Sequence, residues 1–341
     1  MKVDVTELDM FYISYDEPNA EENWADLLNK VPWAKRVHGI KGFDKAHKEC
    51  ARRSETDRFI TIDGDNIVMD DFFEQVLDIP DTDPQGNDIS ESIFSWNAKN
   101  LLNGLVYGNG GLKCWPRDYV LDMKTHEEAE DEEGMEFCWK LNYIQLNDTF
   151  SEVHQTASPF QAFRSGFREG VKMSLDQGKR VAPHEFSEKI WYGNYNRLQV
   201  WCNIGADVEN GLWAIYGARL GCKMAVLDPS WDTNLISDYE WFHGFFYKDI
   251  LPKFAPSDEH FEPDIKTCPR SNVTWCDTSL EISILELQDE LMSEINEMML
   301  TDATVNISKF FKKTYVAPKR WGVMIREKQI QELLEKGLIG N

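Results

Sequence analysis

Residues 58–65 read RFITIDGD, and the rest of the chain is organised around this stretch. Residues 59–62 form a short apolar run with β-branched side chains, which suits a buried strand and is too short for a helix. The run leads into Asp63-Gly64-Asp65, where one glycine separates two carboxylates. A strand that ends in two acids suits Mg²⁺ or Mn²⁺, because these hard cations prefer oxygen ligands and often share them with a phosphate. An Asp-Gly turn that closes a hairpin is the alternative interpretation.

The residues before this stretch alternate between strand and helix patterns. They predict strands at residues 10–14 and 36–40, and helices at residues 20–32 and 44–53. With the RFITIDGD run as a third strand, the alternation predicts a parallel α/β sheet with right-handed crossovers. Ligands of such sheets bind at the carboxyl ends of the strands. Ser14-Tyr15-Asp16 is therefore expected beside Asp63-Gly64-Asp65, and this convergence favours a binding site over a simple turn.

A glycine-rich segment follows at residues 107–115, which read YGNGGLKCW. Three glycines within four positions allow the backbone to approach a ligand closely, and Lys113 is available for a phosphate or an acid. A glycine turn between two strands is the alternative interpretation.

The next segment, residues 127–136, is almost wholly acidic. A solvated loop is the simplest interpretation of such a run. The alternative assigns Asp122, Glu127 or Glu128 to catalysis as a base. His126, just before the run, is either a metal ligand or an ordinary surface or core histidine.

Residues 159–178 predict a helix that carries a cationic stripe beside an apolar face. Arg164, Arg168 and Lys172 recur every four residues. Such a stripe could hold a diphosphate or a DNA backbone, and ion pairing with the many acids of this chain is the alternative.

Residues 309–321 read KFFKKTYVAPKRW and form a basic run interleaved with aromatic residues. Cations for phosphates together with rings for bases are typical of recognition of single-stranded or flipped-out nucleotides. The candidate nucleic-acid contacts are Lys312, Lys313, Lys319 and Arg320. Surface packing of the aromatic residues is the alternative.

The composition limits the classes of protein that remain. The length of 341 residues allows one large domain or two modest ones, and the net charge of −23 argues against coating of nucleic acid by bulk electrostatics. The seven cysteines form no C-x-x-C pair, which argues against zinc and favours reduced thiols in a cytoplasm. The sequence predicts neither a signal peptide nor a membrane span.

The order of these parts resembles the GT-A class of nucleotide-sugar-dependent glycosyltransferases, over roughly residues 8–155. The resemblance rests on Ser14-Tyr15-Asp16, on Asp63-Gly64-Asp65 and on the glycine-rich segment. It implies a GT-A (Rossmann-like) mixed sheet flanked by helices at residues 1–155, which would bind the nucleotide sugar. It also implies a largely helical part at residues 156–341, which would bind the acceptor and complete the site.

The same resemblance implies roles for individual residues. Asp65 would bind Mn²⁺ or Mg²⁺, and Asp63 would contact the metal or the ribose of a UDP-sugar. Ser14, Tyr15 and Asp16 would lie at the nucleobase and ribose, while Asn109, Gly110 and Gly111 would face the donor sugar. The third metal ligand of the family is often a later histidine. His154, His184 and His243 could each take that role, and we assign it to His243.

The whole chain also looks like a group of phage glycosyltransferases that add sugars to hydroxymethylated bases of DNA. This likeness implies transfer of a sugar from a UDP-sugar to 5-hydroxymethylcytosine in double-stranded DNA, in the host cytoplasm. Two alternatives stay open: a glycosyltransferase with a saccharide acceptor, and a non-catalytic α/β binding module. The sequence does not predict the oligomeric state.

Overall fold

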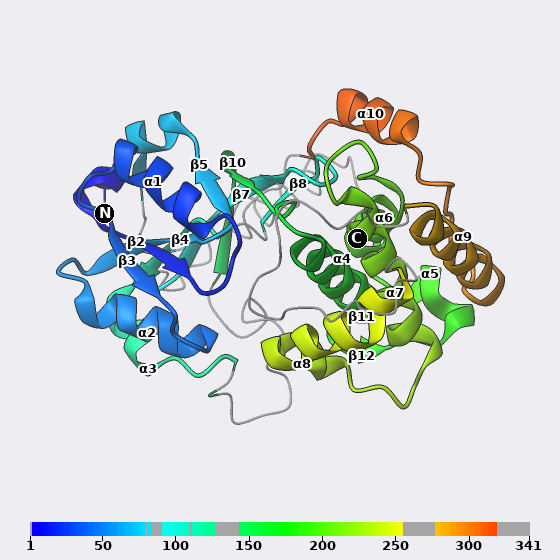
Figure 1. Cartoon of the computed structure of the whole chain (residues 1–341). Coiled ribbons are helices and arrows are strands. Elements are labelled where there is room, and N and C mark those ends of the chain that lie inside the picture. The colour runs from blue at the N-terminus through cyan, green and yellow to red at the C-terminus, as the bar shows by residue number, and fades with distance from the viewer. Residues whose placement is uncertain are drawn as a thin grey trace, which may run out of the picture. The chain divides into compact units, whose positions relative to one another are not determined.

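Two units make up the chain, one built around a β-sheet and one built from helices (Figure 1). The computed structural model describes residues 2–78, 81–82, 91–108, 111–126, 128, 143–254 and 277–318. The sheet unit comprises residues 1–100, 106–154 and 316–341. The helical unit comprises residues 101–105 and 155–315.

The RFITIDGD stretch forms a central strand of a mixed sheet, which has eight strands within the described residues. The order across the sheet is β3 (Lys35–His38), β2 (Asp9–Ser14), β4 (Arg58–Asp63), β9 (Lys113–Pro116), β7 (Ile93–Asn100), β10 (Tyr143–Val153) and β5 (Asn66–Val68), with β8 (Val106–Tyr107) beside β7. Strands β3, β2 and β4 run parallel, whereas β9 is antiparallel to both of its neighbours. β10 runs parallel to β7 and antiparallel to β5.

The mixed α/β fold with helices beside the sheet is confirmed, and so is the parallel pairing of the first three predicted strands. The parallel pairing does not extend beyond β4, so the sheet is mixed, as expected for residues 1–155. Parallel neighbours need a crossover of a dozen or more residues, usually a helix. β7 and β9 are joined through β8 and the glycine-rich segment, without a helix in the described residues between them, and they pair antiparallel.

The two faces of the sheet are covered by different elements. Odd-numbered and even-numbered residues of a strand point to opposite faces. Tyr12 and Ile62 share one apolar cluster with residues of α1 (Ala20–Lys30) and the short helix η2 (Asp70–Glu74). Phe11 and Phe59 belong to a second cluster with residues of α2 (Phe43–Arg53) and α3 (Arg117–Asp122). A separate two-stranded sheet pairs β1 (Lys2–Asp4), which precedes η1 (Val5–Glu7), with β6 (Val76–Asp78).

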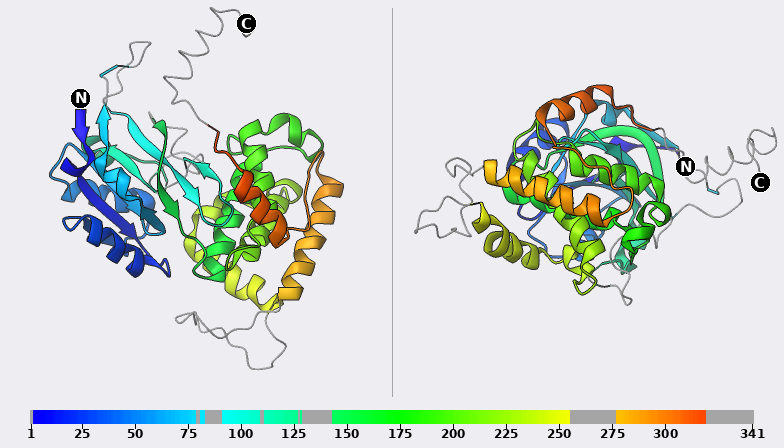
Figure 2. Two further views of the ribbon diagram at one scale, coloured as in Figure 1. Left: turned by 90° about the horizontal axis from the view of Figure 1, so that it is seen from above. Right: turned by 90° about the vertical axis from the view of Figure 1, so that its right-hand side faces the viewer.

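The helical unit is built around α4 (Pro159–Met173) and α7 (Gly211–Leu227). α9 (Asp277–Glu294) packs on α7, and the views in Figure 2 show it on the outside of this unit. The other elements of the unit are β11 (Leu175–Asp176), β12 (Lys179–Arg180), η4 (Pro183–Glu185), α5 (Phe186–Lys189), α6 (Tyr192–Asn203), η5 (Thr233–Ser237), α8 (Tyr239–Gly244), the π-helix η6 (Phe245–Ile250), η7 (Leu251–Lys253) and α10 (Val305–Thr314). No helix in the described part of the chain has the length and apolar character needed to cross a membrane.

α4 is shorter than the helix predicted at residues 159–178. Ser158 caps its first turn by accepting a hydrogen bond from Gln161 N at 3.1 Å. The helix ends at Met173, because Gln177 and Gly178 adopt left-handed backbone conformations and turn the chain into the hairpin of β11 and β12. Apolar periodicity predicted the helix, whereas its end depends on this turn.

A buried arginine joins several segments of the helical unit. Arg219 in α7 is fully buried and donates to Cys202 O at 2.8 Å, to Ile284 O at 2.7 Å and to Thr301 O at 2.5 Å. Burial lowers the pKa of its guanidinium to about 10, so the group is still charged at neutral pH. Arg219 therefore ties α6, α9 and the segment after α9 to α7.

Candidate functional site

The three parallel strands end side by side at one edge of the sheet. Ser14 pairs with His38, and Ile13 pairs with Asp63. Ser14-Tyr15-Asp16 and Asp63-Gly64-Asp65 therefore emerge at the same edge, where ligands of parallel sheets bind. This is the placement that the alternation of strands and helices predicts.

The Asp63-Gly64-Asp65 turn does not close a hairpin. β5, which follows it, pairs with β10, while β4 pairs with β2 and β9. The turn thus carries the chain from one part of the sheet to another. An added Cβ at Gly64 would lie 2.7 Å from Glu17 Oε2 and 3.1 Å from Ile13 O, so a side chain there would displace the Glu17 carboxylate and press on the backbone of β2.

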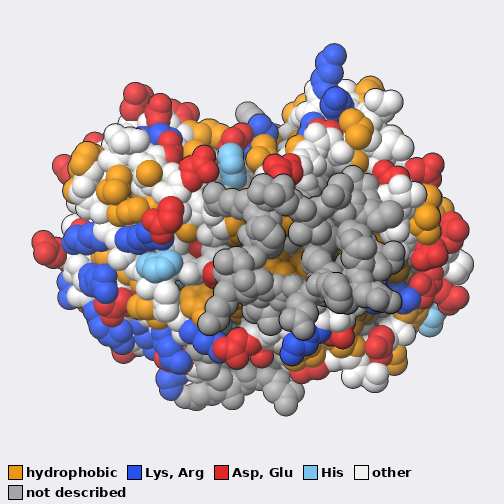
Figure 3. All heavy atoms as spheres, viewed as in Figure 1, with side chains coloured by type: hydrophobic (Ala, Val, Ile, Leu, Met, Phe, Trp, Pro, Cys, Tyr) orange, Lys and Arg blue, Asp and Glu red, His pale blue; other side chains and the backbone are white. Residues whose placement is uncertain are grey.

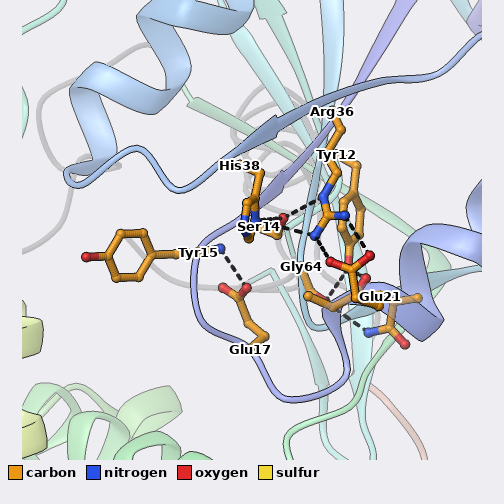
Figure 4. A network of polar contacts seen from close by, with 10 residues as sticks. Tyr12, Ser14, Tyr15, Glu17, Glu21, Arg36, His38 and Gly64 are labelled. Atoms are coloured by element: carbon orange, nitrogen blue, oxygen red, sulfur yellow. Dashed lines mark hydrogen bonds and ion pairs between the residues drawn. The ribbon is translucent and has the colours of Figure 1, made fainter. Parts of the chain in front are cut away.

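Hydrogen bonds hold this turn from several elements. Gly64 O lies 2.6 Å from the Tyr12 hydroxyl and accepts from Asn23 Nδ2 at 2.9 Å (Figure 4). Asp65 O accepts from His154 N at 2.7 Å, and Asp65 Oδ1 accepts from Asn66 Nδ2 at 2.8 Å. Together these contacts hold the backbone of Gly64 and Asp65 and one oxygen of the Asp65 carboxylate.

The hydroxyl of Tyr12 remains a neutral donor throughout the physiological range. Burial raises its pKa, and the nearby carboxylates of Glu17 and Asp65 raise the pKa further. The ring stacks on Trp24 with 5.5 Å between centroids. Tyr12 therefore acts as a rigid support beneath the turn.

The glycine-rich segment lies directly against side chains of the sheet. A Cβ added to Gly111 would lie 2.1 Å from Asp63 Cγ, and one added to Gly108 would lie 1.5 Å from Gln145 Oε1. Asn109 and Gly110 lie outside the described residues. The close backbone approach predicted from the glycines is present, and at Gly111 it brings the segment onto the first carboxylate of the turn.

Lys113 begins β9, pairs with Thr61 and Ser95, and is buried. Thr61 and Asp63 point to the same face of β4, because they are two residues apart. Lys113 and Asp63 both act electrostatically on the buried His47, in opposite directions. The ammonium group of Lys113 and the carboxylate of Asp63 therefore both lie near His47.

His47 is a buried residue of this site that sequence patterns did not single out. Its ring packs against Phe43 at 4.0 Å and Trp115 at 4.8 Å between centroids. Nδ1 lies 2.9 Å from Phe43 O, and because a carbonyl can only accept, the proton is on Nδ1 and Nε2 keeps its lone pair. Burial lowers the pKa of His47 to about 4, although its hydrogen bond to Phe43 O and the carboxylate of Asp63 oppose this effect.

Asp44, at the start of α2, anchors the segment that leads into the acidic run. Its buried carboxylate accepts from Thr125 Oγ1 at 2.6 Å, from Thr125 N at 2.9 Å and from His126 N at 2.9 Å. Burial tends to raise the pKa of Asp44, but these hydrogen bonds lower it below its ordinary value. Glu128 is paired with Lys48 at 2.5 Å.

The acidic run and the residues before it are predicted to supply a metal ligand or a catalytic base. The ring of His126 packs on Phe43 at 4.1 Å between centroids. Asp122 is the last residue of α3. Glu127 lies outside the described residues. The assignment of a base among these acids stays a prediction.

A second polar network lies at the ends of β2 and β3 (Figure 4). Arg36 Nε donates to Ser14 Oγ at 3.0 Å, and Ser14 Oγ lies 2.9 Å from His38 Nδ1. Arg36 Nη2 also lies 3.3 Å from His38 Nδ1, and because a guanidinium can only donate, Nδ1 accepts and the proton of the neutral ring is on Nε2. The guanidinium of Arg36 also binds both carboxylate oxygens of Glu21, at 2.9 and 2.7 Å.

Tyr15 and Asp16 follow this network on the loop after β2. The Tyr15 side chain is 37% exposed and points away from Ser14 and Arg36 (Figure 4). Its backbone N–H donates to Glu17 Oε2 at 2.8 Å, which orders the start of the loop. Asp16 is exposed. The edge thus presents an aromatic ring, a carboxylate and, at His38, an N–H donor.

The predicted cationic stripe and His243 belong to the helical unit. The guanidinium of Arg164 lies over the rings of Tyr239 at 5.2 Å and Phe242 at 5.7 Å, and Arg168 follows one helical turn later. Lys172 pairs with Glu169 at 2.9 Å, so ion pairing accounts for this part of the stripe. His243 in α8 packs near Tyr247, at 4.5 Å between centroids.

The basic run near residue 312 is only partly exposed. Lys312 binds Asp207 at 2.8 Å and Leu101 O at 3.3 Å, whereas Lys313 is exposed. Lys319 and Arg320 lie outside the described residues. Any role of Lys312 in binding nucleic acid competes with this internal ion pair.

The oxygen donors of the turn fit a hard divalent cation. Mg²⁺ usually keeps several waters and binds through one or two carboxylates together with phosphate, so two acids and a nucleotide would suffice. Within the described residues, no group of three or more His, Cys, Asp or Glu side chains is arranged to hold a metal ion. His243 belongs to the helical unit, whereas His154 adjoins Asp65 through its backbone.

Comparison with known proteins adds no family assignment. No model of a known protein family matches the chain, and no curated protein is significantly similar to it.

Proposed function

We propose that this protein is a metal-dependent glycosyltransferase that moves a sugar from a UDP-sugar to a hydroxyl group. The observation that carries the proposal is the edge of the sheet at which Asp63-Gly64-Asp65 emerges beside Ser14-Tyr15-Asp16, with Gly111 against Asp63. The likeness to GT-A enzymes in the order of these segments supports the same conclusion.

The chemistry requires charge stabilisation at the leaving group. When bound, a divalent ion neutralises the charge that develops on the departing diphosphate. Asp63 and Asp65 would hold that ion, and the rigid turn would keep both carboxylates in place. Lys113 would place a positive charge close by. Gly111 would let the backbone of the glycine-rich segment lie directly against Asp63, so that this segment could face the donor sugar.

The network at β2 and β3 would recognise the nucleobase. Its geometry makes His38 Nε2 an N–H donor, and Asp16 is an acceptor. Uracil offers carbonyl acceptors beside an N–H donor, whereas cytosine carries an amino donor in place of one carbonyl. A donor at His38 and an acceptor at Asp16 would match a carbonyl and the neighbouring N–H of uracil, and the exposed ring of Tyr15 would stack on the base.

A titration with UDP in the presence and absence of Mn²⁺ tests the donor site. We expect Mn²⁺-dependent binding of UDP that Asp65→Asn removes, together with a loss of transfer of about 100-fold or more. Asp118→Asn is the matched control, because the side chain of Asp118 is 91% exposed and its change alters the net charge equally. Absence of UDP binding by the unmodified protein would contradict the proposal.

The acceptor favoured by the likeness to phage enzymes is 5-hydroxymethylcytosine in double-stranded DNA. The exposed face of α10 supports it, since Lys309, Phe310 and Lys313 are exposed there. We expect a Lys309→Ser/Lys313→Ser variant to lose DNA binding in a salt-dependent manner. Lys312 stays unchanged because its ion pair with Asp207 is internal.

The control for this experiment is Lys179→Ser/Lys248→Ser, which removes two exposed cations elsewhere on the helical unit. Transfer assays compare hydroxymethylated DNA with unmodified DNA. Sugar transfer that is the same without hydroxymethylated DNA would contradict the DNA acceptor and leave the donor site untouched.

A saccharide acceptor is the second candidate, and the net charge of −23 together with the internal pairing of Lys312 favours it. It predicts transfer to a saccharide and no effect of the Lys309→Ser/Lys313→Ser variant. The third candidate, a non-catalytic binding module, predicts that Asp65→Asn keeps partner binding and that no transfer occurs.

A further inference from the structure

The start of α6 carries two adjacent aromatic side chains that are unusually open to solvent. Trp191 is 52% exposed and Tyr192 is 77% exposed. Trp191 is the N-cap residue of the helix, and its carbonyl accepts from Asn194 N at 2.8 Å and Tyr195 N at 3.0 Å. The backbone beneath the two rings is therefore part of a regular helix.

The ring of Trp191 is held in place by its own helix. A Cβ added to Gly193 would lie between 2.3 and 2.8 Å from three carbons of the six-membered ring, so the indole packs directly on the glycine. The guanidinium of Arg197 lies over the ring, 5.4 Å from its centroid. These contacts restrict the ring before any ligand arrives, and such preorganisation lowers the entropic cost of binding.

We propose that Trp191 and Tyr192 form a binding platform for a neutral saccharide. A sugar ring has a flat face of C–H groups and a rim of hydroxyls. An exposed indole provides a flat apolar surface for the C–H face. Asn194 and Asn196, on the same helix, carry amide groups that can bind the hydroxyls.

The charge around the platform favours a neutral ligand over nucleic acid. Residues 185–197 contain Glu185 and Glu188 as well as Lys189 and Arg197, so their charges cancel. Nucleic-acid binding depends on a surplus of Lys and Arg that neutralises phosphates. A nucleotide whose base stacked on Trp191 would find no surplus of Lys and Arg to neutralise its phosphate.

The platform shares no residue with the proposed donor site. All of its residues belong to the helical unit, and none is proposed to bind UDP or a metal. It would hold a saccharide: an acceptor sugar, or a longer glycan that keeps the protein on its substrate.

The test measures binding of maltohexaose, cellohexaose and chitohexaose to the full chain by calorimetry, with an oligothymidylate as the polyanionic probe. We expect saturable binding of at least one saccharide, and about a tenfold weaker affinity in Trp191→Ala. Gly193→Ala retains the indole but displaces it, so its affinity should also fall. Trp33→Ala is the matched control, because Trp33 is 51% exposed in the sheet unit and should leave binding unchanged.

Three results would overturn the inference: no binding of any of the three saccharides, an equal loss in Trp33→Ala, or binding of the oligothymidylate through Trp191 in place of a saccharide. UDP binding with Mn²⁺ is measured on the same variants and should not change. A protein that binds a saccharide through Trp191 but does not bind UDP would retain this site and contradict the proposed function.

Discussion

At the scale of single residues, the contact between Gly111 and Asp63 leaves no space for a methyl group. Gly111→Ala would place a Cβ 2.1 Å from Asp63 Cγ, so the carboxylate or the segment must move. We expect a loss of Mn²⁺-dependent UDP binding and a destabilisation of about 1 to 3 kcal/mol, measured by calorimetry and urea denaturation. Gly244→Ala is the control, because nothing lies within 4 Å of its added Cβ. Unchanged UDP binding in Gly111→Ala would show that Asp63 does not hold the ligand.

His47 makes the stability of the protein dependent on pH. The pKa of His47 is about 4 in the folded protein, whereas the ordinary pKa of a histidine is 6.5. Between these two pH values the unfolded chain therefore binds more protons than the folded protein. Stability is therefore complete above about pH 6.5 and falls as the pH decreases toward 4, by up to about 3 kcal/mol. Urea denaturation at several pH values measures this loss.

The matched variant for this measurement is His47→Phe, which keeps an aromatic ring between Phe43 and Trp115 but cannot take up a proton. We expect a smaller change in stability over the same pH interval. If the two proteins lose stability equally, the acid sensitivity arises elsewhere.

At the scale of elements, α4 and α7 approach each other through glycines on both helices. A Cβ on Gly166 would lie 1.9 Å from Ala214 O, and one on Gly217 would lie 2.4 Å from Phe163 O. The atoms in the way belong to backbone, so the helices would have to separate. We expect Gly166→Ala to lower the free energy of unfolding by more than about 2 kcal/mol, measured by urea denaturation.

Gly244→Ala again provides the comparison for Gly166→Ala. The backbone of Gly244 is helical and its surroundings are open, so alanine should be neutral or stabilise by up to about 1 kcal/mol. A small effect of Gly166→Ala would mean that the two helices can move apart at little cost.

At the scale of the whole molecule, the dominant feature is the excess of acids, with 59 Asp and Glu against 36 Lys and Arg. On the face in Figure 3 the acidic side chains are spread over both units, and basic side chains gather over β3 and α2. Self-repulsion of a large net charge destabilises the folded state, and salt screens it. We expect sodium chloride to raise the Tm at pH 7 by about 2 to 4 °C, measured by calorimetry.

Choline chloride at the same ionic strength should have the same effect if screening is the cause. Near pH 4.7, the isoelectric point of the sequence, the rise should disappear. A decrease of the Tm with salt at pH 7 would show that surface ion pairs such as Lys2 with Asp78 outweigh the repulsion.

Local patterns predicted much of the sheet unit, because strands and helices of this kind reflect periodicity within a few residues. The three parallel strands, their helices and the common edge of Ser14 and Asp63 all follow from it. The end of α4 did not follow, since it depends on the left-handed turn at Gln177 and Gly178.

The contacts of the site depended on the tertiary structure. Asp63-Gly64-Asp65 could close a hairpin or lead to a distant strand, and only the pairing of β5 with β10 decided this. His38 and His47 lie in ordinary strand and helix patterns, and their protonated nitrogens depend on Arg36 and Phe43. Sequence alone determined which residues a strand presents at its end, because that requires only local backbone geometry. Their partners come from segments far apart in the chain, so only folding determined which groups meet.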